Sequence, residues 1–321
     1  MPGPVKQLGR SEVSLPAFGL GCAALGGLHG SVSDQQAGGA IEAAWRCGLR
    51  YFDTAPLYGR GLGEIRLGNA LRERPREDFI LSTKVGWLAQ PLVPAGNRFG
   101  LPGAICADYT YEGTIRSVED SLNRTGLGRL DIVIVHDIDP YNHGERHGVM
   151  FREAMEGALP ALNDLRRDGL IGAVGIGVNN VDVCLDSLEH ADFDCFILAG
   201  RYTLLDQSAA ERGLLDACRA RTVGVIAAAP FNSGILAGRL DRAETRFNYQ
   251  AADADTVDRA REIARHCAGF GVDLMTAALH FPHLHPAIVS VLPGVPGIGD
   301  PGVPLLTPTE FGGVGGTGGA G

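Results

Sequence analysis

The stretch GLRYFDTAPLYGRGLG, residues 48–63, places an aspartate and a tyrosine at the end of one short apolar segment. Residues 49–52 form a brief run of the kind found in the buried strands of parallel sheets, and Asp53 stands where that strand would enter a loop containing Tyr58. A phenol has a pKa of roughly 10, so it can exchange protons near neutral pH only where a cation stabilises its phenolate. A site at Tyr58 therefore requires a nearby lysine.

The next two apolar runs end in a lysine and a histidine. Residues 79–83 (FILST) lead into Lys84, and residues 132–135 (IVIV) lead into His136. Catalytic groups at the C-terminal ends of consecutive strands are typical of a (β/α)₈ barrel. Taken singly, these residues could be a loop cap, a loop aromatic, a solvated lysine and a structural histidine. Their shared position at strand ends favours a catalytic site.

At these residues the chain resembles the aldo-keto reductase superfamily, whose active-site tetrad is Asp, Tyr, Lys and His in this order. The resemblance continues through GLIGAVGIGVNN (169–180), AGRYTLLDQ (199–207) and APFNSGILAG (229–238), and it stops near Gly294. DYTYEGTIRSVEDSLNRTGL (108–127) and VHDIDPYNHG (135–144) look most like a bacterial branch that oxidises aldoses or pyridoxal.

The resemblance implies a role for each member of the tetrad. Tyr58 would exchange a proton with the substrate oxygen while a hydride moves between the substrate carbon and a nicotinamide. Lys84 would lower the pKa of this phenol, Asp53 would pair with Lys84, and His136 would hydrogen-bond the reacting oxygen. The implied function is NAD(P)-dependent oxidation of an aldose of the L-fucose or D-threo-aldose type at C1. Pyridoxal oxidation is one alternative, and a non-catalytic or defective barrel is another.

The resemblance also implies a cofactor site, without deciding between NAD and NADP. Asn179 and Asn180 would hold the nicotinamide carboxamide, although Asn179 replaces a serine of the family and Ala199 replaces a glutamine. Tyr202 would stack on the ring, and the loop after the seventh strand would place backbone N–H groups against the pyrophosphate. Trp87 would form a wall of the substrate pocket; simple packing is the alternative. The complete set of expected cofactor contacts is Gly21, Asn179, Asn180, Tyr202, Phe231, Ser233, Gly234 and Leu236.

Composition favours small-molecule chemistry. The chain has 321 residues and a formal net charge of -9, with no stripe of Lys and Arg that would suit nucleic acid or an anionic membrane. Neither a signal sequence nor an apolar run of roughly 18 residues is present, which predicts a cytoplasmic protein. The seven cysteines lack a C-x-x-C pair, and the histidines lack a metal-ligand spacing, so we expect reduced thiols and no metal. The expected partner is a small aldehyde or sugar, with the chain a monomer or a weak homo-oligomer.

Alternation of apolar runs and helical patterns predicts eight strands, most of them joined by helices. A hairpin around Gly9 would plug the N-terminal end of the barrel. The motif Gly19–Ala24 fits G-x-G-x-x-A, but further glycines follow where a Rossmann helix should begin, which argues against a dinucleotide fold of that type. Strands are expected at 17–20, 51–53, 79–84, 132–136, 173–177, 195–198, 223–228 and 288–292. Helices are expected at 34–47, 64–72, 110–127, 151–167, 181–190, 210–221, 256–270 and 274–281, with long loops at 86–107 and 137–148.

Beyond residue 293 the helical pattern is lost. Residues 294–321 are dominated by Gly and Pro, which predicts a disordered tail following a barrel formed by residues 1–293. A member of the resembled family would instead continue into a charged loop and a closing helix. The final helix of the barrel is therefore expected to be missing.

Overall fold

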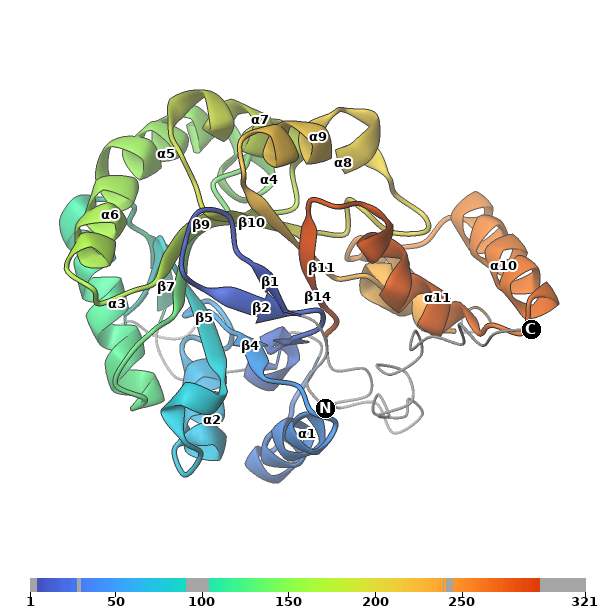
Figure 1. The fold of residues 1–321 in the computed structure, drawn as a ribbon, viewed down its shortest axis with the longest axis horizontal. Helices are drawn as coiled ribbons and strands as arrows, with labels where there is room; N and C mark the ends of the chain where they lie inside the picture. The colour runs from blue at the N-terminus through green and yellow to red at the C-terminus, as the bar shows by residue number, and fades with distance from the viewer. Residues whose placement is uncertain (1–4, 28–29, 91–103, 239, 241–244, 295–321) are drawn as a thin grey trace, which may run out of the picture.

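The structure is a computed structural model that describes residues 5–27, 30–90, 104–238, 240 and 245–294. Its centre is an eight-stranded parallel sheet whose strands follow one another around a ring in chain order (Figure 1). The predicted (β/α)₈ barrel is confirmed. The strands are β3 (Leu20–Gly21), β4 (Tyr51–Asp53), β5 (Ile80–Val85), β8 (Ile132–His136), β9 (Ala173–Val178), β10 (Cys195–Ala199), β11 (Gly224–Ala228) and β14 (Ile288–Leu292).

The first and last strands close the ring through a short seam. Phe18 and Gly21 form parallel bridges with Val291 and Gly294, and the Gly21 N–H donates to the carbonyl of Pro293 over 2.9 Å. The first strand is regular over two residues only, β3, rather than over the predicted 17–20. Closure therefore depends on isolated bridges rather than on a long ladder.

The N-terminal hairpin occupies the predicted place. Strands β1 (Val5–Gln7) and β2 (Ser14–Pro16) pair antiparallel, and Leu8 and Leu15 are fully buried in the inner core with residues from the starts of the barrel strands. The Lys6 ammonium donates to the carbonyl of Ile288 over 2.8 Å. The hairpin thus closes the end of the barrel opposite the strand termini that carry the site residues.

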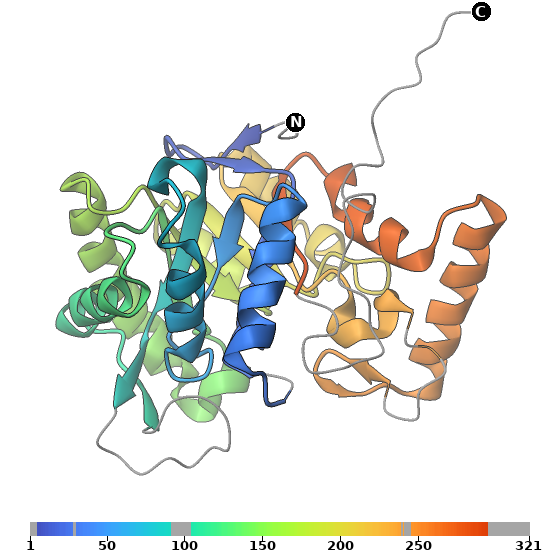
Figure 2. The same cartoon turned by 90° about the horizontal axis from the view of Figure 1, so that it is seen from below.

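Helices surround the strands, and α1 and α2 lie side by side on one flank (Figure 2). Ser33, rather than the predicted Asp34, caps α1, because its hydroxyl accepts from the Gln36 N–H in a capping box. Most other helices lie within a few residues of their predicted bounds. They are α1 (Asp34–Arg46), α2 (Leu62–Leu71), α3 (Tyr111–Thr125), α7 (Val181–His190), α9 (Leu214–Ala220), α10 (Ala254–Gly269) and α11 (Leu274–His280).

Two predicted helices are interrupted. The one expected at 151–167 is α5 (His147–Glu153), a π-turn at Ala154–Ala158 and α6 (Leu159–Arg167). Pro160 has no N–H for an ordinary helical bond, and the wider turn accommodates it. The helix expected at 210–221 is α8 (Ser208–Glu211) and α9, because Gly213 between them adopts a φ of 76°.

Both long segments predicted as loops contain regular structure. Within 86–107, β6 (Trp87–Gln90) and β7 (Ala104–Ala107) pair antiparallel. Gly86 starts this ribbon at a φ of 100°, and a Cβ there would lie 2.0 Å from the ring of Tyr109. The segment 137–148 contains α4 (Pro140–His143), a short 3₁₀ turn and the start of α5.

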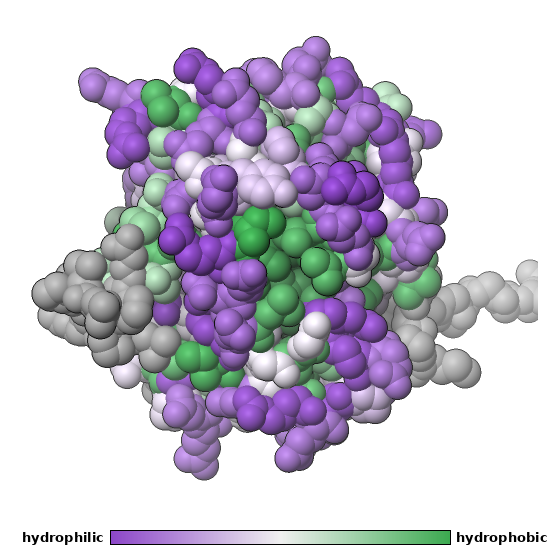
Figure 3. All heavy atoms as spheres, turned by 90° about the vertical axis from the view of Figure 1, so that its left-hand side faces the viewer, coloured by the Kyte–Doolittle hydropathy of each residue, from purple (hydrophilic) through white to green (hydrophobic). Residues whose placement is uncertain are grey.

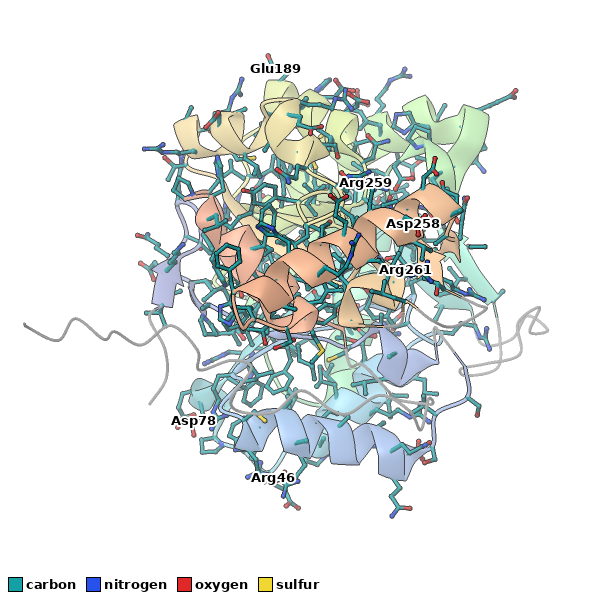
Figure 4. All side chains as sticks on the ribbon, turned by 90° about the vertical axis from the view of Figure 1, so that its right-hand side faces the viewer. Arg46, Asp78, Glu189, Asp258, Arg259 and Arg261 are labelled. Atoms are coloured by element: carbon teal, nitrogen blue, oxygen red, sulfur yellow. The ribbon has the colours of Figure 1, made fainter. Side chains whose placement is uncertain are left out.

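The two lateral faces differ in what they expose. On the face shown in Figure 3, built by the helices at the left of Figure 1, hydrophobic side chains gather between borders of hydrophilic ones. On the opposite face, α10 presents Asp258, Arg259 and Arg261 (Figure 4). In the described part of the chain, no helix has the length and apolar character to span a membrane. Apart from Gly294, the predicted tail and the place of the missing helix lie outside the described residues.

Candidate active site

The four residues predicted as a tetrad lie at the C-terminal ends of three neighbouring strands. Asp53 ends β4, Lys84 is the penultimate residue of β5, and His136 ends β8. All three side chains are almost completely buried, whereas Tyr58, in the loop after β4, is partly exposed. Strand order alone therefore brings these groups together.

A buried ion pair forms the base of the site. The Lys84 ammonium lies 2.7 Å from Asp53 Oδ2 and donates a second hydrogen bond to the carbonyl of Thr54 over 2.8 Å. The other oxygen, Asp53 Oδ1, accepts from the Ser82 hydroxyl at 2.7 Å, and Ser82 in turn lies 3.1 Å from the Tyr51 hydroxyl. The predicted pairing is confirmed. Ser82 and Tyr51 were not predicted as part of the site. Strand alternation indicates that they face inward, but it does not indicate which side chains they contact.

Tyr58 projects its ring over this pair. Its centroid is 4.9 Å from Lys84 Nζ and 6.0 Å from the ring of His136, which stands edge-on to it. The Tyr58 hydroxyl makes no hydrogen bond with any described residue. Behind it, Gly26 and Gly59 pack backbone against backbone, and a Cβ on Gly26 would lie 2.3 Å from the carbonyl carbon of Tyr58. The loop thus holds the phenol in place and leaves its oxygen free for a substrate.

Burial dominates the proton chemistry of the site. It raises the pKa of Tyr58 well above the usual value, and the nearby carboxylates Asp53 and Asp137 raise it further. In this structure the Lys84 charge is paired with Asp53, and the expectation that Lys84 lowers the pKa of Tyr58 stays a prediction. Burial and the Lys84 charge hold the pKa of His136 well below its usual range. At neutral pH the site therefore presents a neutral phenol and a neutral imidazole.

Asp137 is a site residue that the sequence analysis missed. It follows His136 with a φ of 55°, and its Oδ2 lies 3.4 Å from His136 Nε2. Burial, with a further contribution from Asp139, raises the pKa of Asp137 to about 7. In the sequence it lies in VHDIDPYNHG (135–144), which also contains Asp139. A carboxylate directly after a strand-end histidine was the available signal.

Trp87 lies in an aromatic group at the start of β6. Its ring stacks on His143 at 5.2 Å and stands edge-on to Tyr109 at 6.5 Å. The Tyr109 hydroxyl donates to the backbone carbonyl of His136 over 2.7 Å, so this group is attached to β8, the strand that ends at His136. The indole nitrogen of Trp87 is buried without a hydrogen-bond partner among the described residues. This placement is compatible with a pocket wall.

The residues expected at the nicotinamide make contacts within the protein. The Asn180 side chain caps α7 by accepting from the Val183 N–H at 3.1 Å, and the Asn179 carbonyl accepts from Arg201 Nε at 2.7 Å. The Tyr202 ring contacts Phe281 at 5.1 Å, and no ring contact links it to the tetrad within the described residues. Stacking of Tyr202 on a nicotinamide ring stays a prediction.

Two of the N–H groups expected at the pyrophosphate are used within the loop itself. Gly234 and Leu236 both donate their N–H groups to the carbonyl of Phe231, whereas the Ser233 N–H has no partner among the described residues. The buried amide oxygen of Asn232 also lacks a partner. Gly21 uses its N–H in the barrel seam. In the described parts of the chain, no cluster of three or more His, Cys, Asp or Glu side chains could hold a metal ion.

Comparisons with known proteins agree with this geometry. The family model described as "Aldo/keto reductase family" matches residues 17–298. The chain is 40% identical to pyridoxal 4-dehydrogenase of Microbacterium luteolum over 90% of this chain and 88% of the relative. It is 38% identical to D-threo-aldose 1-dehydrogenase of a Pseudomonas species, over 88% of this chain and 86% of the relative.

Solved structures support the fold. An aldo-keto reductase of Bacillus halodurans superimposes with a TM-score of 0.71 at 23% identity, covering 96% of this chain and 94% of its own. Glycerol dehydrogenase of Gluconobacter oxydans gives a TM-score of 0.71 at 22% identity, over 97% and 94%. The chain belongs to the aldo/keto reductase family and is an oxidoreductase of that type.

Proposed function

We propose that this protein oxidises an aldose at C1, with NAD or NADP as the hydride acceptor and Tyr58 as the proton acceptor. The observation that carries the proposal is the unbonded Tyr58 hydroxyl, which lies beside a neutral His136 and above the buried Lys84–Asp53 pair. Proton transfer by a positioned side chain contributes typically about 10²- to 10⁴-fold to a rate.

Each residue has a defined task. His136, held neutral, donates a hydrogen bond to the C1 oxygen and orients it toward Tyr58. Tyr58, in its phenolate form, accepts the C1 hydroxyl proton as the hydride leaves C1, which yields the lactone and a neutral phenol. The Lys84 ammonium, 4.9 Å from the centre of the Tyr58 ring, stabilises the negative charge that develops on the phenol oxygen. Asp53 fixes the lysine by hydrogen bonds that leave neither carboxylate oxygen free.

The cofactor would be held by side-chain amides at one end and by the loop after β11 at the other. The unpaired Ser233 N–H and the buried, unpaired amide oxygen of Asn232 are groups that a phosphate and its neighbouring hydroxyls could satisfy. Asn179 would contribute its side-chain amide at the nicotinamide end. When bound, the nicotinamide supplies the acceptor for the hydride from C1. The choice between NAD and NADP stays open.

Pyridoxal oxidation is the second candidate function. The stacked pair of Trp87 and His143 favours it, because a flat aromatic substrate packs well against aromatic faces. The free carboxylate of Asp137 favours a hydroxyl-rich substrate instead, because such a substrate can donate hydrogen bonds to it. We place the aldose first for this reason.

The test is a panel of aldoses and pyridoxal, each offered with NAD and with NADP while nicotinamide absorbance is followed. We expect one or more aldoses to be oxidised, and Tyr58→Phe to lower turnover by at least about 100-fold. Dinucleotide affinity, measured by fluorescence, should stay nearly constant in this variant. Tyr111→Phe, which removes a hydroxyl from an exposed tyrosine on α3, is the matched control. Oxidation of pyridoxal alone, or full turnover in Tyr58→Phe, would contradict the proposal.

A further inference from the structure

Asp137 adopts a backbone conformation that side-chain-bearing residues rarely take. Strand β8 ends at His136, and Asp137 turns the chain with a φ of 55° while its N–H donates to the carbonyl of Gly177 over 2.8 Å. Residues held in such sparsely populated conformations cluster at functional sites. The turn places the carboxylate beside His136 Nε2, at 3.4 Å.

The Asp137 carboxylate is also poorly satisfied. Its side chain is 21% exposed, and it accepts no hydrogen bond from any described residue. The neighbouring Asp139 is fully buried and differs clearly, because it accepts bonds from both the backbone and the side-chain amide of Asn142. A largely buried carboxylate without donors is costly, and the raised pKa of Asp137 reflects this cost. A bound molecule with a hydroxyl group would supply the missing donor.

The groups around Asp137 come from several separate elements. Its charge raises the pKa of Tyr58, in the loop after β4, and of Tyr249, in the hairpin of β12 (Arg246–Phe247) and β13 (Gln250–Ala251). The hairpin is fixed to the loop after β11, because the Tyr249 N–H donates to the Ser233 hydroxyl over 2.8 Å. Asp137 is therefore near both the Tyr58 phenol and the Tyr249 phenol.

We propose that Asp137 is a specificity residue, which binds a hydroxyl group on the carbon next to the one that is oxidised. This inference rests on the proposed function, in which His136 hydrogen-bonds the C1 oxygen. A hydroxyl on C2 lies within a hydrogen bond's length of that oxygen, and the Asp137 carboxylate lies beside the histidine nitrogen that would hold it. The favoured substrate class is a 2-hydroxyaldehyde in its cyclic form, that is, an aldose rather than a deoxy sugar or a simple aldehyde.

The experiment compares kcat/KM for an aldose and for its 2-deoxy counterpart in the full-length protein. The wild type should prefer the aldose by about 10- to 100-fold, the range expected for one hydrogen bond to a charged group. In Asp137→Ala this preference should shrink to within about threefold, because the aldose loses efficiency while the 2-deoxy sugar does not. Asp137→Asn, which keeps an acceptor oxygen without the charge, should fall between the two.

Asp168→Asn is the control for the change of charge, because this aspartate is 60% exposed at the end of α6. It should leave the preference intact, and melting curves should show that every variant is folded. If the wild type oxidises aldoses but the Asp137 variants keep the full preference for the aldose, this inference fails while the proposed function stands. The same holds if the wild type oxidises aldoses without any preference over the 2-deoxy sugar. If no aldose is oxidised, the proposed function fails and the inference fails with it.

Discussion

In the proposed oxidation, Tyr58 lies where it can exchange a proton with the substrate, but its surroundings favour the neutral phenol rather than the phenolate that oxidation requires. Its pKa is raised by burial and by two carboxylates, so the phenol is neutral near pH 7. A neutral phenol is ready to donate a proton in carbonyl reduction. In oxidation, Tyr58 must instead accept a proton from the substrate, which requires the phenolate. The low phenolate fraction therefore limits the rate of oxidation.

This state predicts opposite pH profiles for the two directions. Between pH 7 and pH 9, kcat/KM for oxidation should rise by up to about tenfold per pH unit. While the pH is below the pKa of Tyr58, each unit of increase in pH raises the phenolate fraction tenfold. Reduction should stay nearly flat over the same range, because the protonated phenol remains the main form. Initial rates in both directions with an uncharged substrate provide the measurement. An oxidation rate that is flat or falls with rising pH would show that Tyr58 is not the titrating base.

The tetrad was predictable from the sequence and Asp137 was not, for a physical reason. Asp53, Lys84 and His136 end apolar runs, and parallel strands bring such ends together wherever the loops go. The role we propose for Asp137 depends on a positive φ and on a lack of donors to its carboxylate among the described residues, and its position after a strand-end histidine reveals neither. The position of Tyr249 near Asp137 likewise depends on how the hairpin of β12 and β13 folds.

At the scale of elements, a buried carboxylate joins two helices to the barrel. Glu64 of α2 is fully buried; it accepts from the Thr83 hydroxyl of β5 at 2.7 Å and from Arg124 Nε of α3 at 2.5 Å. Thr83 is the residue before the catalytic lysine. This network therefore supports β5 from the outside while Asp53 holds Lys84 on the inside.

Removal of Glu64 should be costly. Glu64→Ala leaves the largely buried Arg124 guanidinium without its partner, so we expect the free energy of unfolding to fall by about 3–5 kcal/mol. Urea denaturation measures the loss. Glu42→Ala is the control, because its ion pair with Arg74 lies on the surface and should contribute less than about 1 kcal/mol. Equal small losses in both variants would mean that the network does not hold the helices together.

Elements were harder to predict where the chain departs from one regular pattern. The apolar period of 151–167 is that of one helix, and nothing in it distinguishes an ordinary turn at Pro160 from the observed π-turn. The β6–β7 ribbon was read as loop because its two strands are separated by residues rich in Gly and Pro. Pairing between distant short segments leaves little trace in local sequence.

For the whole molecule, β14 completes the ring. It pairs with β11 and, through Val291, with Phe18, and Ile288, Val291 and Leu292 are almost fully buried. Each of these side chains contributes about 1.5–3 kcal/mol by burial. The described residues up to Gly294 thus contain the complete set of barrel strands.

This closure predicts the outcome of two truncations. A chain ending at Gly294 should fold and melt cooperatively, because every strand of the ring is retained. A chain ending at Ala287 lacks β14 and should fail to fold, because both edges of the ring and the inner core are exposed. Circular dichroism and thermal melting of the two chains provide the measurement. If the chain that ends at Gly294 also fails to fold, residues beyond 294 are required for the barrel, and the proposed boundary at 294 is wrong.

The short seam between the first and last strands also bears on how the protein is made. Phe18 is synthesised long before its partner Val291, so the ring cannot close until β14 has left the ribosome. Open strand edges pair readily with other chains, and intermediates of this kind are prone to aggregate. Strands that pair before β14 has been made therefore expose an edge that the bridges to Val291 and Gly294 cover later.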